Sequence, residues 1–142
     1  DYLGRGETIL VVDDIREQRN IATNMLEKLG YVVSTVDSGE AAVAYLKKQG
    51  VDLVILDMIM EPGIDGLKTY RLICEHCKDQ RAIIASGYSE TDRVLEAQRL
   101  GAGTYVKKPY TLEKIGVAVR SELDRHQSDT VATKNTKNQP KK

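Results

Sequence analysis

Five short apolar runs alternate with amphipathic helical patterns along this chain, and this alternation limits the possible folds more than any other feature. Apolar residues recur at helical spacing over residues 15–29, 38–50, 67–77, 89–100 and 111–123. The apolar runs cover residues 7–12, 31–36, 52–56, 82–85 and 104–106. Strands that alternate with helices predict an α/β fold, with a parallel sheet covered by helices on both faces.

Right-handed crossovers favour one strand order for such a sheet. We predict a doubly wound, five-stranded parallel sheet of order 2-1-3-4-5, which is the flavodoxin-like arrangement. In that order the winding reverses between the first and third strands. Ligands of such sheets bind outside the carboxyl ends of the strands at this reversal, so the fold alone predicts where a site should lie.

Three aspartates stand at the predicted place. Asp13 and Asp14 directly follow the first apolar run, and Asp57 directly follows the third. Because the carboxyl ends of parallel strands share one edge, these acids should lie together and repel one another, unless a divalent cation or a phosphoryl group's counter-charges are present. Simpler interpretations remain for each acid alone, since Asp14 can cap the following helix and Asp57 can be an ordinary loop carboxylate.

The fourth and fifth runs end close to a hydroxyl and an ammonium group. Ser86 follows the fourth run, and Lys107 and Lys108 follow the fifth. Lys107 should point away from Lys108, because successive strand side chains alternate. Asp57 can act as a nucleophile, the paired acids can hold a hard cation, and Ser86 and a lysine can contact phosphoryl oxygens. The sequence therefore predicts phosphoryl transfer to a carboxylate.

This motif order resembles the receiver domain of the two-component response-regulator family. The resemblance covers residues 7–125 and implies that Asp57 is the phospho-acceptor. It further implies that Ser86 and Tyr105 form the switch, and that Lys108 contacts the phosphoryl group and precedes a cis-proline, Pro109.

The family's chemistry supplies further expectations. The resemblance implies a Mg²⁺ or Mn²⁺ site made of Asp13, Asp14, Asp57 and the backbone carbonyl of Ile59. A phosphohistidine of a histidine kinase or histidine phosphotransfer domain would donate to Asp57, and the domain would catalyse its own phosphorylation and dephosphorylation without being a stand-alone turnover enzyme. The surface formed by residues 89–100, 104–106 and 111–123 would then change shape, and a homodimer through that surface is a further option.

The ends of the chain and its overall charge suggest its setting. Residues 1–6 are interpreted as a linker, residues 7–126 as the receiver domain and residues 127–142 as a disordered tail. The linker resembles the join between a kinase catalytic domain and a C-terminal receiver, which favours a hybrid sensor histidine kinase over a single-domain regulator.

The 21 basic and 21 acidic residues cancel, so the charge does not favour direct binding to nucleic acid or membrane. No apolar stretch approaches the ~20 residues of a spanning helix. The two cysteines make no disulfide framework. We therefore expect a cytoplasmic protein, or the cytoplasmic part of a membrane-bound sensor kinase.

The loop over residues 60–66 departs from the family, and three rival functions compete with the receiver. This loop is one residue longer than the family's Met-Pro-x-Met-Asp-Gly pattern, with Glu61 as the apparent insertion.

A flavodoxin-like cofactor binder needs a phosphate-cradling loop after the first strand, where this chain has two acids. An aspartate-nucleophile phosphatase carries a second acid at the position of Ile59. A degenerate docking module would not need the complete set of acids, hydroxyl and lysine.

A CxxC pair, Cys74 and Cys77 with His76 between them, suggests zinc or redox chemistry only weakly. One such pair does not close a tetrahedral site, and the sequence has no second pair.

Overall fold

The computed structural model describes residues 2–87 and 91–137, with side-chain surroundings up to residue 125. Five strands alternate with five helices along these residues, as the sequence predicts. The strands are β1 (Thr8–Val12), β2 (Val32–Val36), β3 (Leu53–Asp57), β4 (Ala82–Ser86) and β5 (Tyr105–Lys107). The helices are α1 (Arg16–Lys28), α2 (Gly39–Lys48), α3 (Gly66–His76), α4 (Asp92–Arg99) and α5 (Leu112–Lys137).

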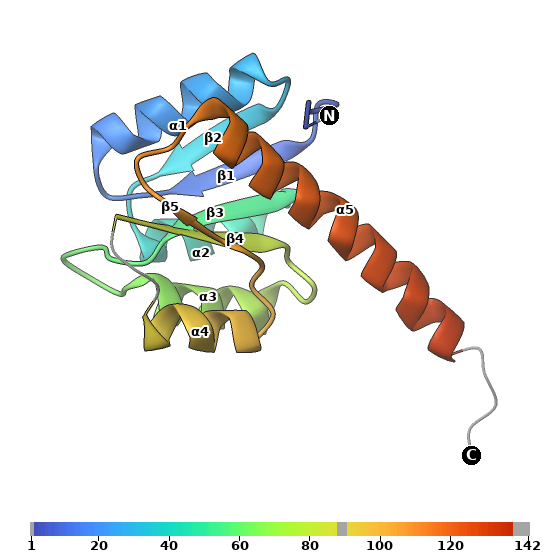
Figure 1. The fold of residues 1–142 in the computed structure, drawn as a ribbon. Coiled ribbons are helices and arrows are strands. Elements are labelled where there is room, and N and C mark those ends of the chain that lie inside the picture. The colour runs from blue at the N-terminus through green and yellow to red at the C-terminus, as the bar shows by residue number, and fades with distance from the viewer. Residues whose placement is uncertain (1, 88–90, 138–142) are drawn as a thin grey trace.

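All strand pairs are parallel, and their order is β2-β1-β3-β4-β5, which confirms the predicted topology (Figure 1). The register aligns the carboxyl ends of neighbouring strands, since Asp57 lies beside Ala85 and Ser86 lies beside Lys107. Several strand bounds differ from the prediction by one residue: β1, β2, β3 and β5 begin one residue later, and β3, β4 and β5 end one residue later. The later ends, at Asp57, Ser86 and Lys107, follow from pairing across β3, β4 and β5, which extends these strands toward the carboxyl edge.

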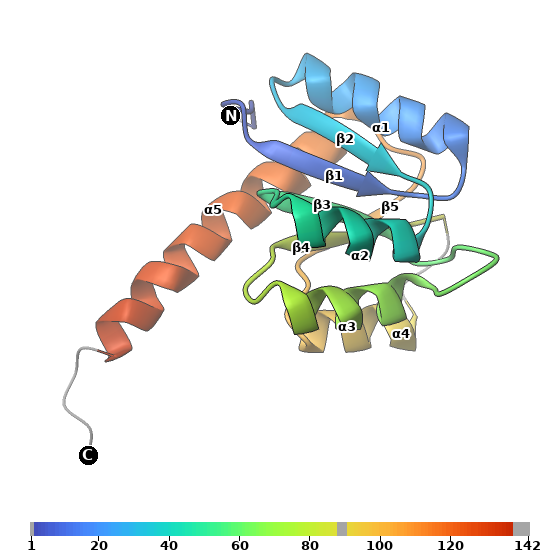
Figure 2. The same cartoon turned by 180° about the vertical axis from the view of Figure 1, so that it is seen from behind.

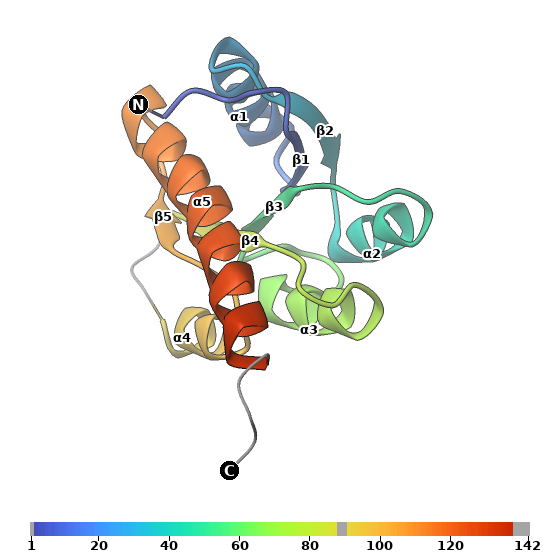
Figure 3. The same cartoon turned by 90° about the vertical axis from the view of Figure 1, so that its right-hand side faces the viewer.

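The sheet has an apolar layer on each face. α1 and α5 cover one face, with Ala22, Leu26 and Ile115 packed on the side chains of alternate strand residues. α2, α3 and α4 cover the other face, where Ile73 and Val94 are buried (Figures 2 and 3). Because both faces are covered, β1, β3 and β4 are buried along nearly their whole length, and only the strand ends are open to ligands.

Side-chain caps mark where α2, α3, α4 and α5 begin, and Thr111 caps α5 by accepting from the amide of Lys114 at 3.1 Å. The hydroxyl of Ser38 accepts from the amide of Ala41 at 3.0 Å, as the sequence predicts for α2. Asp65 caps α3 by accepting from the amide of Lys68 at 3.0 Å. Thr91 caps α4 by accepting from the amide of Val94 at 3.3 Å. These caps set the path of the loops that enter the carboxyl edge of the sheet.

The N-terminal segment (residues 2–6), predicted to be a linker, lies against the domain. The amide of Gly4 donates to the carbonyl of Leu29 at 2.7 Å, and the amide of Gly6 donates to Gly30 at 3.0 Å. Arg120 of α5 donates to the carbonyl of Leu3 at 3.3 Å and pairs with Glu7 at 2.8 Å. The segment therefore bridges the turn before β2 and helix α5, and its assignment as a linker stays a prediction.

Helix α5 passes through residue 126, the predicted end of the domain, and continues to Lys137 (Figure 1). Extending an existing helix adds one hydrogen bond for each residue fixed and requires no new nucleation, so polar residues can prolong it. Because α5 continues through residue 126, the helix does not mark the domain boundary there, and that boundary stays a prediction. None of the helices in the described residues is both long and apolar enough to cross a membrane.

Candidate functional site

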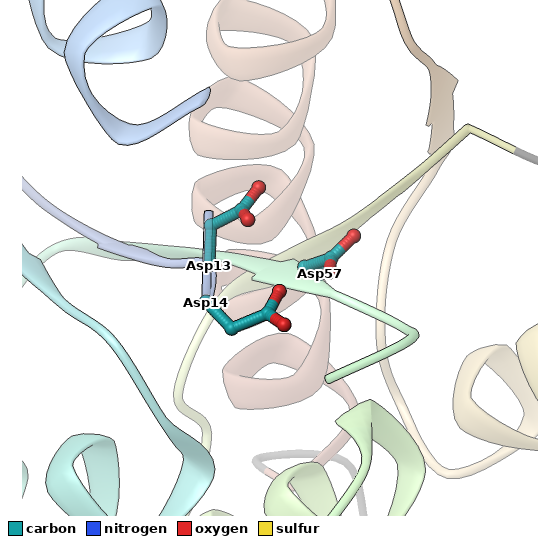
Figure 4. Close-up of side chains that lie close together, drawn as sticks. All are labelled: Asp13, Asp14 and Asp57. Carbon is teal, nitrogen blue, oxygen red and sulfur yellow. The ribbon is translucent and has the colours of Figure 1, made fainter. Parts of the chain in front are cut away.

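Four strand ends bring the predicted site residues to one edge of the sheet. Asp13 and Asp14 follow β1, and Asp57 ends β3. The three carboxylates extend toward the same space, each offering an oxygen within 4.8 Å of the others (Figure 4). Asp13 and Asp57 are buried, with 2% and 6% of their surface exposed. Negative charge is therefore concentrated where the fold argument placed a ligand.

Lys108, which follows β5, is the cation of this cluster. Its ammonium donates to Asp57 Oδ1 at 3.1 Å and also to Asp13 Oδ2. Its side chain is largely buried, whereas Lys107 is exposed, so the two lysines point apart as the strand alternation predicts. The amide of Lys108 donates to the carbonyl of Ser86 at 2.8 Å, and the peptide bond between Lys108 and Pro109 is cis.

The single positive charge of Lys108 does not neutralise the three carboxylates of this largely buried cluster. Burial raises the pKa of Asp57 to about 6, the ammonium of Lys108 opposes this rise, and the carboxylate of Asp13 adds to it. Asp14 Oδ1 is buried and finds no hydrogen-bond partner among the described residues. Oxygen ligands, excess negative charge and an unsatisfied carboxylate oxygen together fit a hard divalent cation.

The simpler interpretation of Asp14 as a helix cap does not hold. Ile15 occupies the N-cap position of α1, and that end of the helix has no side-chain cap. Asp13 instead holds this turn, with its Oδ1 accepting from the amide of Ile15 at 2.9 Å and its carbonyl accepting from Arg19 at 2.9 Å. Asp14 therefore remains directed into the acidic cluster.

A cavity of about 470 Å³ opens over the cluster. Its lining residues come from several loops and from α1: Asp14, Ile15, Gln18, Asp57, Ile59, Glu61, Ser86, Gly87, Lys108 and Pro109. Gln18 is a lining residue that the strand ends do not predict. Its position, one helical turn after Asp14, places it on the side of α1 that faces the acids. Ile59 lines the cavity with its side chain half exposed. The role of its backbone carbonyl as a metal ligand stays a prediction.

Ser86 and Tyr105 lie on neighbouring strands, β4 and β5. Ser86 is buried at the end of β4, and Tyr105 is half-buried on the neighbouring strand, paired in register with Ile84. Tyr105 packs at the edge of the apolar layer that α3 and α4 cover. Their switch role stays a prediction.

Tyr110 is a buried phenol close to the site that the cavity does not include. Burial raises the pKa of Tyr110, and the negative charges of Asp13 and Asp57 add to the effect.

Cys74 and Cys77 are free and half-buried, and burial raises the pKa of the Cys74 thiol. Within the described residues, the three aspartates are the group of acids, cysteines or histidines that could hold a metal. The structure thus gives no support to zinc chemistry at the CxxC pair.

Gly66 fixes the approach of α3 to the site. A methyl group there would lie 2.5 Å from the carbonyl oxygen of Asp57 and 2.7 Å from the Cα of Met58. Gly66→Ala is therefore expected to displace the end of β3 and to lower the free energy of unfolding by about 1–3 kcal/mol. Urea unfolding followed by circular dichroism measures this. Gly50→Ala is the matched control, because a methyl group at Gly50 meets nothing within 4 Å; equal losses in both variants would contradict the steric account.

The pKa of Asp57 predicts a pH-dependent stability of the metal-free protein. Its folded pKa of about 6 exceeds the ordinary value of 3.8, so the folded state binds the proton more tightly and the free energy of unfolding falls as the pH rises between these values. In EDTA at pH 7, Asp57→Asn should be more stable than the wild type by roughly 1–3 kcal/mol. The difference should shrink below pH 6 and vanish near pH 4. Urea unfolding across this range tests it, and equal stability at pH 7 would contradict it.

Comparisons with known proteins agree on one family. The family model of the response regulator receiver domain matches residues 9–120. Sporulation initiation phosphotransferase F of Bacillus subtilis is 34% identical over 117 residues, which are 82% of this chain and 94% of that protein. The regulatory protein VanRc of Enterococcus gallinarum is 34% identical over 122 residues, or 85% of this chain, and this chain spans 52% of it.

Solved structures agree on the fold. The N-terminal domain of a response regulator/sensory box/GGDEF 3-domain protein from Carboxydothermus hydrogenoformans is 26% identical, with a TM-score of 0.81, covering 87% of this chain and 99% of that one. A CheY-like response regulator receiver domain protein from Methanospirillum hungatei has the same TM-score of 0.81 at 20% identity, covering 88% of this chain and 99% of that one. At that identity the second likeness speaks for the fold alone.

Proposed function

Because this chain belongs to the response regulator receiver domain family, we propose that Asp57 is the residue that accepts a phosphoryl group from a phosphohistidine. The family acts in phosphorelay signal transduction through phosphorylation of an aspartate, and the phosphotransferase relative supports phosphoryl transfer here. In the proposed step an oxygen of Asp57 bonds to phosphorus, and the bond from phosphorus to the donor nitrogen breaks with its electron pair left on nitrogen.

The observation that carries this proposal is the shared cavity. Asp57 lines it together with the hydroxyl of Ser86 and the ammonium of Lys108, whereas Asp13 lies beneath it, almost fully buried. A phosphoryl group on Asp57 would have a positive charge and a hydroxyl donor within its own cavity. These are the groups that offset charge on the oxygens of a phosphoryl group in transfer.

The acidic cluster supports a cation requirement. We infer that Asp13, Asp14, Asp57 and the carbonyl of Ile59 hold Mg²⁺ or Mn²⁺, for which Asp14 Oδ1 is an unused ligand atom. When bound, such a cation supplies positive charge to the phosphoryl oxygens. Self-catalysed phosphorylation and dephosphorylation belong to the same proposal.

The proposal includes a switch formed by Ser86 and Tyr105. The hydroxyl of Ser86 would turn toward a phosphoryl oxygen, and the side chain of Tyr105 would turn into the space behind it. The surface of α4, β5 and α5 would then differ between the two states, whose populations phosphorylation shifts. A groove between β5 and α5, lined by Tyr105, Lys107 and Val117 among others, lies on that surface and is where a homodimer would form.

Receiver domains in two-component systems interact with histidine kinases or phosphotransfer proteins. For this chain we propose that the donor is a histidine kinase or a histidine phosphotransfer domain. The domain arrangement of residues 1–6, 7–126 and 127–142, and a hybrid histidine kinase as the parent protein, remain part of this proposal. Nothing in the net charge favours direct contact with nucleic acid or membrane.

A small phosphodonor tests the chemistry directly. The wild-type protein incubated with phosphoramidate and Mg²⁺ should gain one phosphoryl group by intact mass, and EDTA should prevent the gain. Hydroxylamine should remove the group, because it cleaves an acyl phosphate and leaves phosphate esters of serine, threonine or tyrosine intact. A gain that persists in hydroxylamine, or no gain while a control receiver is modified, would reject the proposal.

A further inference from the structure

Glu61, the apparent insertion in the β3–α3 loop, stands between two cavities. It lines the cavity that holds Asp57, Ser86 and Lys108. It also lines a neighbouring cavity of about 600 Å³, which reaches to the first turn of α4. Asp57 belongs to the first cavity alone, whereas Glu61, which is exposed, borders both.

The main chain around Glu61 is held in place on several sides. The amide of Glu61 donates to Asp14 Oδ2 at 3.5 Å, on the β1 side of the site. Farther along the loop, the amide of Ile64 donates to Glu40 of α2 at 3.3 Å. Asp65 pairs with Arg93 of α4 at 2.5 Å. These contacts to three other parts of the domain hold the main chain of Glu61 beside both cavities.

The carboxylate of Glu61, unlike its main chain, is not held by other described residues. Within the described residues it makes no hydrogen bond or ion pair, and the residue is exposed. Of the other acids that line this cavity, Asp57 contacts Lys108, and Asp14 belongs to the acidic cluster. Glu61 therefore presents a hydrogen-bond acceptor to the water that enters the cavity.

We propose that Glu61 orients the water molecule that hydrolyses the phosphoryl group on Asp57, and so shortens the lifetime of the phosphorylated state. This inference rests on the proposed phosphorylation of Asp57. An attacking water approaches in line with the breaking bond, from the side of phosphorus opposite Asp57, which is the open side of the cavity. Glu61 accepts a hydrogen bond from this water and points its oxygen at phosphorus.

The step balances without another reactant. The water oxygen bonds to phosphorus, and the bond from phosphorus to Asp57 breaks with its electron pair returning to the carboxylate. The proton of the water passes to an oxygen of the departing phosphate. Since Glu61 acts as an acceptor rather than as a base, the amide oxygen of a glutamine can replace it.

Decay of the phosphorylated protein tests this role. Wild-type protein is phosphorylated with phosphoramidate and Mg²⁺, the donor is removed by rapid desalting, and the remaining phosphoryl group is followed by intact mass. Glu61→Ala is expected to lose it about three- to tenfold more slowly, the worth of one oriented hydrogen bond. Glu61→Gln should decay within about twofold of the wild type, because its amide oxygen still accepts.

Two further variants show whether the effect belongs to Glu61 itself or to the loss of any polar side chain. Glu75→Ala removes an exposed glutamate from the last turn of α3, at the opposite edge of the sheet, and should decay like the wild type. Gln18→Ala removes the amide that α1 presents to the same cavity, and it tests whether α1 rather than Glu61 orients the water. The thermal shift caused by Mg²⁺ should be equal in Glu61→Ala and the wild type.

The opposite results overturn the inference in distinct ways. Wild-type decay in Glu61→Ala, faster decay, or a Glu61→Gln variant as slow as Glu61→Ala rejects the water-orienting role. Slow decay in Gln18→Ala alone assigns the water to α1. A lost Mg²⁺ shift in Glu61→Ala assigns its effect to cation binding. A wild-type protein that takes up no phosphoryl group rejects the proposed function itself, and the inference with it.

Discussion

Asp57→Asn is expected to take up no phosphoryl group under conditions that phosphorylate the wild-type protein completely. Asparagine fills the same space at the end of β3, but its amide lacks the carboxylate oxygen that attacks phosphorus. The variant should remain folded, since Asp57 is buried beside a lysine that keeps Asp13 as its partner. Intact mass after incubation with phosphoramidate and Mg²⁺ measures the loss.

The control for this result is Asp37→Asn. Asp37 directly follows β2 at the same edge of the sheet, but it is exposed and lies outside the cavity. Phosphorylation of the control should match the wild type. If Asp57→Asn still gained a hydroxylamine-sensitive phosphoryl group, another carboxylate would be the acceptor, and Asp13 and Asp14 would be the first to examine.

Lys108→Ala is expected to slow phosphorylation by small donors by about a hundredfold or more. Its ammonium contacts Asp57 at 3.1 Å and lines the cavity, so it lies beside any phosphoryl oxygen that approaches. Removing one preorganised group that meets developing charge typically costs about 10²–10³ in rate. The initial rate of phosphoryl gain, followed by intact mass, gives the ratio.

Lys107→Ala provides a matched comparison, because Lys107 is the exposed neighbour on the same strand. Its rate should equal that of the wild type. Removing Lys108 also leaves Asp13 and Asp57 without their cation, so urea unfolding in the presence of Mg²⁺ must show that the variant is folded at the assay temperature. A folded Lys108→Ala that reacts at the wild-type rate would exclude a role for this ammonium in the transfer.

The sheet and the residues at its edge were accessible from the sequence because both depend on short-range rules. Apolar runs of strand length predicted β1, β3 and β4, and parallel pairing then required Asp13, Asp57 and Ser86 to meet. Strand alternation separated Lys108 from Lys107. No tertiary information was needed for these steps, since register follows from the strands themselves.

Other features depend on contacts between distant segments, which sequence patterns do not encode. The sequence predicts Glu61 as an insertion, but its place beside both cavities depends on Asp14, Glu40 and the pairing of Asp65 with α4. The contribution of Gln18 depends on how α1 packs over β1. The attachment of residues 2–6 depends on Arg120, which is remote in the sequence.

That attachment determines how the domain bears a mechanical load. A force applied at the N-terminus is carried by two sets of hydrogen bonds before it reaches β1. The amides of Gly4 and Gly6 bind the turn before β2, and Arg120 of α5 binds the carbonyl of Leu3. Pulling on the chain therefore loads the turn before β2 and helix α5 before it loads the sheet.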